Sequence, residues 1–162
     1  MHKGTMLTRM MIATVGAAAL AITGTATAET IPAMSGGVTA NHKAVCFAKS
    51  SVTGVVSNIG PAPTCEFSNL WVIGMPVINF NAKAATFSMK AGAAPASSTN
   101  CRIRARSRDQ LVSASSTFAT ATVVGSWQHL ATSAITVPAN GFLFADCTVP
   151  MTSELGVVAY TP

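Results

Sequence analysis

Four arginines alternate with small or apolar residues near the middle of the chain, starting directly after Cys101. In a β-strand, side chains two residues apart share one face, at a spacing of about 6.7 Å. The alternation therefore predicts a row of four guanidinium groups on one face: Arg102, Arg104, Arg106 and Arg108. The residues between them, including Ile103 and Ala105, would face the core together with Cys101.

A row of arginines suits two roles. Guanidinium groups bind phosphate and carboxylate groups through paired hydrogen bonds, so the row predicts a site for an acidic polysaccharide, lipopolysaccharide, extracellular DNA or another polyanion. The alternative is a solvated stripe that keeps one sheet face wet and discourages pairing between sheet edges. Neighbouring charges at this spacing repel by only ~0.6 kcal/mol in water. The row contains no aromatic residue, which disfavours nucleic-acid binding by base stacking.

Four cysteines are spaced too widely for a metal or redox motif. They are Cys46, Cys65, Cys101 and Cys147. Since none forms a CxxC pair, neither a thioredoxin-type site nor a zinc knuckle is indicated. Of the three possible pairings we favour Cys46–Cys65 with Cys101–Cys147, because sequential pairing ties neighbouring strands without crossing the fold. In the chain-entropy model these bonds contribute roughly 3 and roughly 4 kcal/mol.

Aromatic residues offer a second kind of binding surface. Phe142 and Phe144 have the same parity as Asp146 and the opposite parity to Cys147. If Cys147 faces the core, both phenylalanines either lie under a loop or a second sheet, or form an exposed patch for a partner. Trp127 is open to two similar interpretations, an anchor in the core or a platform for a sugar ring.

No motif in the chain specifies catalysis or a metal site. It contains neither a G-x-S-x-G elbow nor an H-E-x-x-H pair, the motifs of serine hydrolases and zinc peptidases. We interpret His42 and His129 as structural or surface residues. The five acidic residues show no pairing of the kind that a glycosidase needs. We therefore predict a protein without enzyme activity, cofactor or metal ion.

Residues 1–28 have the features of an export signal. Lys3 and Arg9 give a positive start, Met10–Ile22 is an apolar run, and Ala26–Ala28 offers a cleavage site. We expect a secreted or periplasmic protein whose cysteines pair in an oxidising compartment. An uncleaved membrane anchor is the alternative. Charge is sparse, with 9% charged residues and a formal net charge of +5, far from the density of a dedicated DNA-binding protein.

The elements that would position these residues are short strands. Pro32 and the Gly36–Gly37 pair predict a flexible N-terminal arm over residues 29–42. From residue 43 to 162, runs rich in β-branched and aromatic residues alternate with Gly, Pro and Asn, which predicts one all-β domain, an antiparallel sandwich of about eight short strands. The predicted strands are Lys43–Lys49, Gly54–Ile59, Cys65–Ile73, Ala85–Lys90, Cys101–Ser107, Thr117–Val124, Gln128–Val137, Phe142–Val149 and Leu155–Thr161.

The order of these features resembles a diffuse group of small exported bacterial proteins, each a four-cysteine β domain. The resemblance is carried by Cys46, Gly60 leading to Cys65, Cys101-Arg102-Ile103, Trp127-Gln128-His129-Leu130, Phe142 to Pro150, and Gly156 to Tyr160. It covers residues 43 to 161 and implies a compact β-sandwich with paired disulfides. It implies no catalytic residues, and it says nothing about the arginine row.

Together these observations predict an exported, disulfide-stabilised module that binds a ligand and carries out no catalysis. The predicted binding residues are those of the arginine row. One alternative is a structural subunit of a pilus-like assembly, in which residues 29–42 would serve as a donor strand for a neighbouring copy. Another is a small secreted hydrolase, which would need two or more carboxylates, or His129, to line one pocket.

Overall fold

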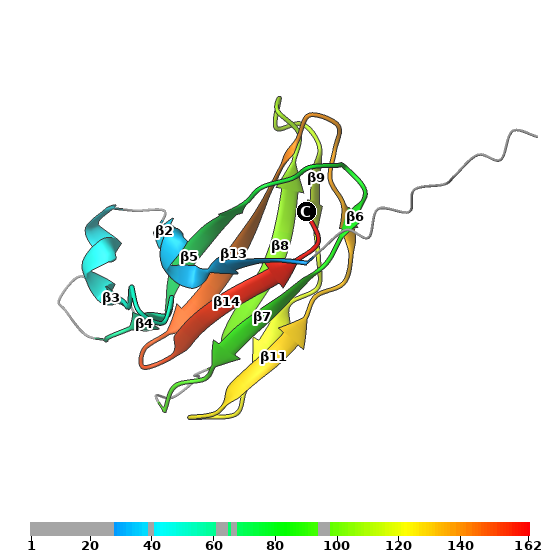
Figure 1. Cartoon of the computed structure of the whole chain (residues 1–162). Helices are drawn as coiled ribbons and strands as arrows, with labels where there is room; N and C mark the ends of the chain where they lie inside the picture. Colours follow the sequence, from blue (N-terminus) through cyan, green and yellow to red (C-terminus); the bar gives the residue numbers. More distant parts are fainter. Residues whose placement is uncertain (1–27, 39–40, 61–64, 66–67, 94–97) are drawn as a thin grey trace, which may run out of the picture.

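The structure, a computed structural model, describes residues 28–38, 41–60, 65, 68–93 and 98–162, and they form two facing antiparallel β-sheets (Figure 1). Short 3-10 turns, η1 and η2, cover Ala33–Ser35 and Asn41–Cys46. The strands are β1 (Glu29–Pro32), β2 (Gly37–Val38), β3 (Phe47–Lys49), β4 (Val56–Asn58), β5 (Ser68–Met75), β6 (Ala82–Lys83), β7 (Ala85–Lys90), β8 (Thr99–Arg106), β9 (Ser113–Ser115), β10 (Ala119–Ala121), β11 (Trp127–Ala131), β12 (Ile135–Thr136), β13 (Phe142–Pro150) and β14 (Glu154–Tyr160). The predicted all-β antiparallel fold is confirmed.

Each sheet is built around one long central strand. The first sheet, here sheet A, has the order β11-β7-β14-β4-β3, and β1 also pairs with β14. The second, sheet B, has the order β10-β8-β13-β5-β2, and β9 also pairs with β8. The short strands β6 and β12 form a separate pair. The outer faces of sheets A and B are therefore the two broad surfaces of the molecule.

The core lies between the inner faces of the two sheets. Sheet B contributes Trp71 and Ile103, and sheet A contributes Phe87 and Leu155, all at most 1% exposed. Burial along β8 alternates strictly, with every second residue buried. This confirms the predicted inward orientation of Cys101, because apolar side chains with a period of two residues can bury one face of a strand.

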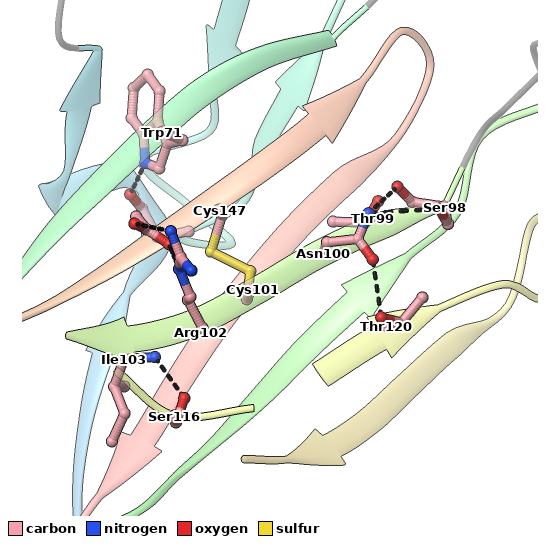
Figure 2. The surroundings of a disulfide bond; sticks show 12 residues. Trp71, Ser98, Thr99, Asn100, Cys101, Arg102, Ile103, Ser116, Thr120 and Cys147 are labelled. Carbon is pink, nitrogen blue, oxygen red and sulfur yellow. Dashed lines mark hydrogen bonds and ion pairs between the residues drawn. A yellow bond between two sulfur atoms is a disulfide. The ribbon is translucent and has the colours of Figure 1, made fainter. Parts of the chain in front are cut away.

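Both favoured disulfides are present. Cys46, at the end of η2, bonds to Cys65, and Cys101 in β8 bonds to Cys147 in β13. The second bond joins directly opposed residues of adjacent strands in sheet B, with their Cα atoms 4.1 Å apart (Figure 2). The described residues include no free cysteine.

The N-terminal segment differs from the flexible arm predicted over residues 29–42. Its first part, β1, pairs with β14, and a later part, β2, pairs with β5. Within β14, strand β4 pairs only with Glu154 and Leu155, at the start of that strand. The later residues of β14, 157–160, pair with β1 instead. Buried backbone groups require hydrogen-bond partners, so β1 completes the sheet, which the weak alternation of the segment did not reveal.

Several predicted strands are shorter than expected, and one is divided: Gly54–Ile59 is reduced to β4 and Thr117–Val124 to β10. Residues 43–46 lie in the 3-10 turn η2, and the region predicted as Gln128–Val137 divides into β11 and β12. The predicted signal peptide, residues 1–28, lies outside the described residues except for Ala28. The described part of the chain contains no helix that is long and apolar enough to cross a bilayer.

Candidate functional site

Strand β8 places three of the four predicted arginines on the outer face of sheet B. Arg102, Arg104 and Arg106 are partly exposed, and the residues between them are buried. The inward-facing residues of β8 hold the strand in place, because Cys101 is covalently bound to β13 and Ile103 is completely buried. We call the surface formed by these three arginines with Phe142, Phe144 and Asp146 the arginine face.

Arg108 does not belong to this row. It lies in an exposed turn after the end of β8, where the chain reverses toward β9. Gln110 has a φ of 64°, and the amide of Ser107 donates to the carbonyl of Val112, which closes the turn. The predicted fourth member of the row is therefore displaced by the hairpin. Strand alternation, from which it was predicted, ends where the chain turns.

A buried carboxylate lies beside the first two arginines. Asp146 of β13 lies directly opposite Arg102, and its side chain is 9% exposed. The Nε of Arg102 donates to Oδ1 at 2.9 Å, and Nη1 of Arg104 donates to Oδ2 at 3.2 Å. One carboxylate thus serves two guanidinium groups, and it accepts charge-assisted hydrogen bonds from both.

Aromatic rings from neighbouring segments pack against the arginines. The guanidinium carbon of Arg102 lies 4.6 Å from the ring centroid of Phe118, and that of Arg104 lies 5.9 Å from the ring of Phe144. Phe142 and Phe144 are themselves stacked, with centroids 5.8 Å apart. The predicted outward parity of both phenylalanines is confirmed, since Phe142 is 46% exposed. The aromatic groups missing from the arginine row in the sequence are thus supplied by adjacent strands and loops.

The charge on the arginine face is not balanced. The face carries three arginines and one carboxylate, which pairs with Arg102 and Arg104, and within the described residues Arg106 takes part in no ion pair. The Nε atoms of Arg104 and Arg106 are buried without a hydrogen-bond partner in this part of the chain. An excess of positive charge packed against aromatic rings is suited to an anionic ligand.

An apolar hollow adjoins the cations. It has a volume of about 580 Å³, and its lining includes Val72, Gly74, Pro76, Phe142 and Phe144. Gly74 and Phe144 lie in the same row across sheet B as Arg104, so the hollow and the positive charge are continuous. A ligand on this face would therefore meet charge at one end and an apolar surface at the other.

A negative charge lies in the turn that carries Arg108. The hydroxyl of Ser107 and the amide of Leu111 both donate to the carboxylate of Asp109. These hydrogen bonds, that of Ser107 foremost, lower the pKa of Asp109 below its usual value. Asp109 therefore stays ionised beside Arg108, so the turn adds little net charge to the arginine face.

Sequence reasoning missed the role of Asp146, although a signal for it was present. If Cys101 and Cys147 are bonded across an antiparallel pair, the preceding and following residues must also lie opposite each other. The same register then continues in steps of two along both strands. It places Arg102 opposite Asp146, Arg104 opposite Phe144, and Arg106 opposite Phe142.

The other predicted candidates are dispersed. Trp127 lies on the outer face of sheet A and is 42% exposed, which excludes the core-anchor interpretation. His129 follows it on the same edge strand, β11. The described residues contain no group of three or more His, Cys, Asp or Glu that could hold a metal ion.

Comparison of the chain with protein-family models, with curated proteins and with solved structures finds no match. The resemblance to small exported four-cysteine proteins therefore stays a prediction. Any function must be argued from the geometry of the two outer faces.

Proposed function

We propose that this protein is an exported binding module without catalytic activity, and that its arginine face binds an anionic polymer. The observation that carries the proposal is the charge imbalance on sheet B. Asp146 offsets one of three positive charges, and Arg106 has no ion pair within the described residues. Because an excess positive charge in an ordered row attracts a chain of negative charges, the ligand class that suits this surface is a polyanion.

The shape of the face favours an extended ligand. Arg104 and Arg106 are two residues apart on a regular strand, so their guanidinium groups repeat along a straight line. An acidic polysaccharide or the phosphate-bearing part of lipopolysaccharide repeats its charges in the same manner. The adjoining hollow beside Phe142 and Phe144 offers contact for the apolar parts of such a molecule.

The two disulfides support a location outside the reducing cytoplasm. Disulfides form and persist in the periplasm and in the extracellular space, and both cysteine pairs are bonded. Together with the predicted signal peptide, they favour secretion or residence in the periplasm. Binding there would take place where polysaccharides and lipopolysaccharide are exposed.

The rival functions find less support in the geometry. A donor-strand subunit would require residues 29–42 to be available to a neighbour, but β1 pairs with β14 of its own chain. A hydrolase would require grouped acid–base residues. Among the described residues Asp146 is bound by arginines, Glu154 pairs with Lys90, and Glu29 lies beside the hydroxyl of Tyr160.

The test is retention on heparin–agarose in a sodium chloride gradient. We expect the double variant Arg104→Ser/Arg106→Ser to elute at clearly lower salt than the wild-type protein, because both changes remove charge from the arginine face. The matched control is Lys49→Ser/Lys90→Ser, which removes the same charge from sheet A. If the two double variants elute together, retention reflects net charge alone and the proposed site is wrong.

A further inference from the structure

A second hollow lies on the opposite side of the molecule, on the outer face of sheet A. It has a volume of about 550 Å³. Its lining includes residues from four segments: Thr53, Ser57, Ser88, Trp127, Glu154 and Gly156. We call it the tryptophan groove. Neither the arginine row nor the proposed anionic ligand involves these residues.

A β-bulge creates the space for the tryptophan ring. The register between β7 and β14 shifts between Leu155 and Val158. Gly156 lies in this shift, and a Cβ atom there would come within 3.1 Å of Cζ3 of Trp127. The missing side chain therefore lets the indole ring lie close against β14, at the edge of the groove. A bulge beside a surface site is a common means of redirecting side chains.

The charges of the tryptophan groove cancel. Nζ of Lys90 lies 2.8 Å from Oε2 of Glu154 and 5.6 Å from the ring centroid of Trp127. Register places Trp127, Lys90 and Glu154 in one row, which continues to Ser57 on β4. The groove thus presents an indole ring and the carboxylate of Glu154, and the neighbouring Lys90 balances the charge of that carboxylate.

Hydroxyl groups complete the lining. Ser57 and Ser88 line the groove, and their hydroxyls make no hydrogen bond within the part of the chain that the structure describes. Ser57 is half-buried and Ser88 is 8% exposed, so the hydroxyl of Ser57 is the more accessible of the two to a ligand. Each hydroxyl can both donate and accept, which suits ligands that carry many hydroxyls of their own.

We infer that the tryptophan groove binds a neutral saccharide. A pyranose ring has one face of C–H groups, which complements the negative face of an aromatic ring, and a rim of hydroxyls. Trp127 would take the C–H face, and Glu154, Lys90 and the serine hydroxyls would bind the rim. The groove has no excess charge to select an anion, so this site differs in ligand class from the arginine face and adds a second function.

The first test is native affinity electrophoresis through gels containing neutral polysaccharides: hydroxyethylcellulose, dextran, galactomannan or soluble starch. We expect at least one of these gels to retard the wild-type protein, and Trp127→Ala to weaken the interaction by about tenfold. The matched control is Phe80→Ala, which removes an aromatic ring that is 42% exposed, like Trp127, but lies outside both the tryptophan groove and the arginine face, and it should leave retardation unchanged. Wild-type protein unretarded in all four gels, or Trp127→Ala retarded equally, would overturn the inference.

The second test uses fluorescence. Trp71 is 1% exposed and Trp127 is 42% exposed, so a ligand in the groove should shift the emission of Trp127 alone. Titration with oligosaccharides from the retarding polysaccharide should shift the emission of the wild-type protein but not that of Trp127→Phe. Gly156→Ala, which crowds the ring, should weaken binding severalfold. Arg104→Ser/Arg106→Ser should bind the neutral sugar normally, so failure of the anionic site is distinguishable from failure of this one.

Discussion

The two outer faces of the sandwich differ in how their charges are balanced. On sheet B, Arg102 and Arg104 share one buried carboxylate, and Arg106 has no ion pair among the described residues. On sheet A, one lysine pairs with one glutamate, both partly exposed. The first face therefore retains positive charge, whereas the second is neutral at its centre.

The backbone produces a second difference. Strands β8 and β13 keep a continuous register over seven residue pairs, so their outward side chains form regular rows. Strand β14 contains a bulge that interrupts its register with β7. A regular ladder thus gives a face with charges repeated along a row, and the bulge gives the groove beside Trp127. The comparison shows how two antiparallel sheets of similar size can present surfaces for different ligand classes.

The largest effect is expected from the disulfides, which are distributed unequally between the two regions. Cys101–Cys147 joins β8 to β13 directly beneath the arginine face, while Cys46–Cys65 ties η2 to the segment before β5. Replacing the first pair with alanines should lower the free energy of unfolding by about 4 kcal/mol, and replacing the second by about 3 kcal/mol. Urea denaturation measures both values. Unchanged stability in either variant would show that its disulfide leaves the unfolded state unconstrained.

Substitutions of Asp146 and Glu154 should have intermediate effects on the free energy of unfolding, and the two effects should differ in size. Asp146→Asn removes a buried charge that accepts hydrogen bonds from two arginines, so we expect a loss of about 2–3 kcal/mol in the free energy of unfolding. Glu154→Gln breaks one partly exposed pair and should cost about 0.5 kcal/mol. Equal losses in urea denaturation would contradict the difference drawn between the two faces.

The smallest effect at neutral pH concerns the contact that joins the two sheets. The hydroxyl of Tyr160, at the end of β14, lies 2.8 Å from the carbonyl oxygen of Pro76, which follows β5. Burial raises the pKa of Tyr160 above its usual value of about 10, and the neighbouring Glu29 raises it further. Above pH 10 the unfolded state loses this proton while the folded state keeps it, so stability should fall as pH rises.

The pH dependence can be assigned with one variant. Tyr160→Phe should be less stable than the wild-type protein at pH 7, and the difference should shrink as the pH rises above 10. Lys83 changes the stability in the opposite direction. Burial lowers the pKa of its ammonium group in the folded state, so the folded protein loses this proton before the unfolded protein does, and stability rises with pH. Since both proteins contain Lys83, comparison of their melting temperatures cancels it. A constant difference across this pH range would rule out Tyr160 as the source.

Much of the fold was predictable from local patterns. The alternation from Cys101 to Arg106 identified a strand with one buried face, and the order of the cysteines favoured the two disulfides that the structure contains. The arm over residues 29–42 was not predictable in the same way. Its pairing with β14 and β5 depends on backbone groups that those strands leave unpaired, and such groups have no signal in the sequence of the arm.

The sequence by itself determined which side chains share a face, because side chains alternate along every extended strand whatever lies beside it. Tertiary structure decided which faces meet. Asp146 lies beside two arginines, and Trp127 lies against Gly156, because pairing and register bring together residues that are distant in the chain. Contacts between strands follow from the packing of the whole sandwich, so the balance of charge on each face became visible once both sheets were in place.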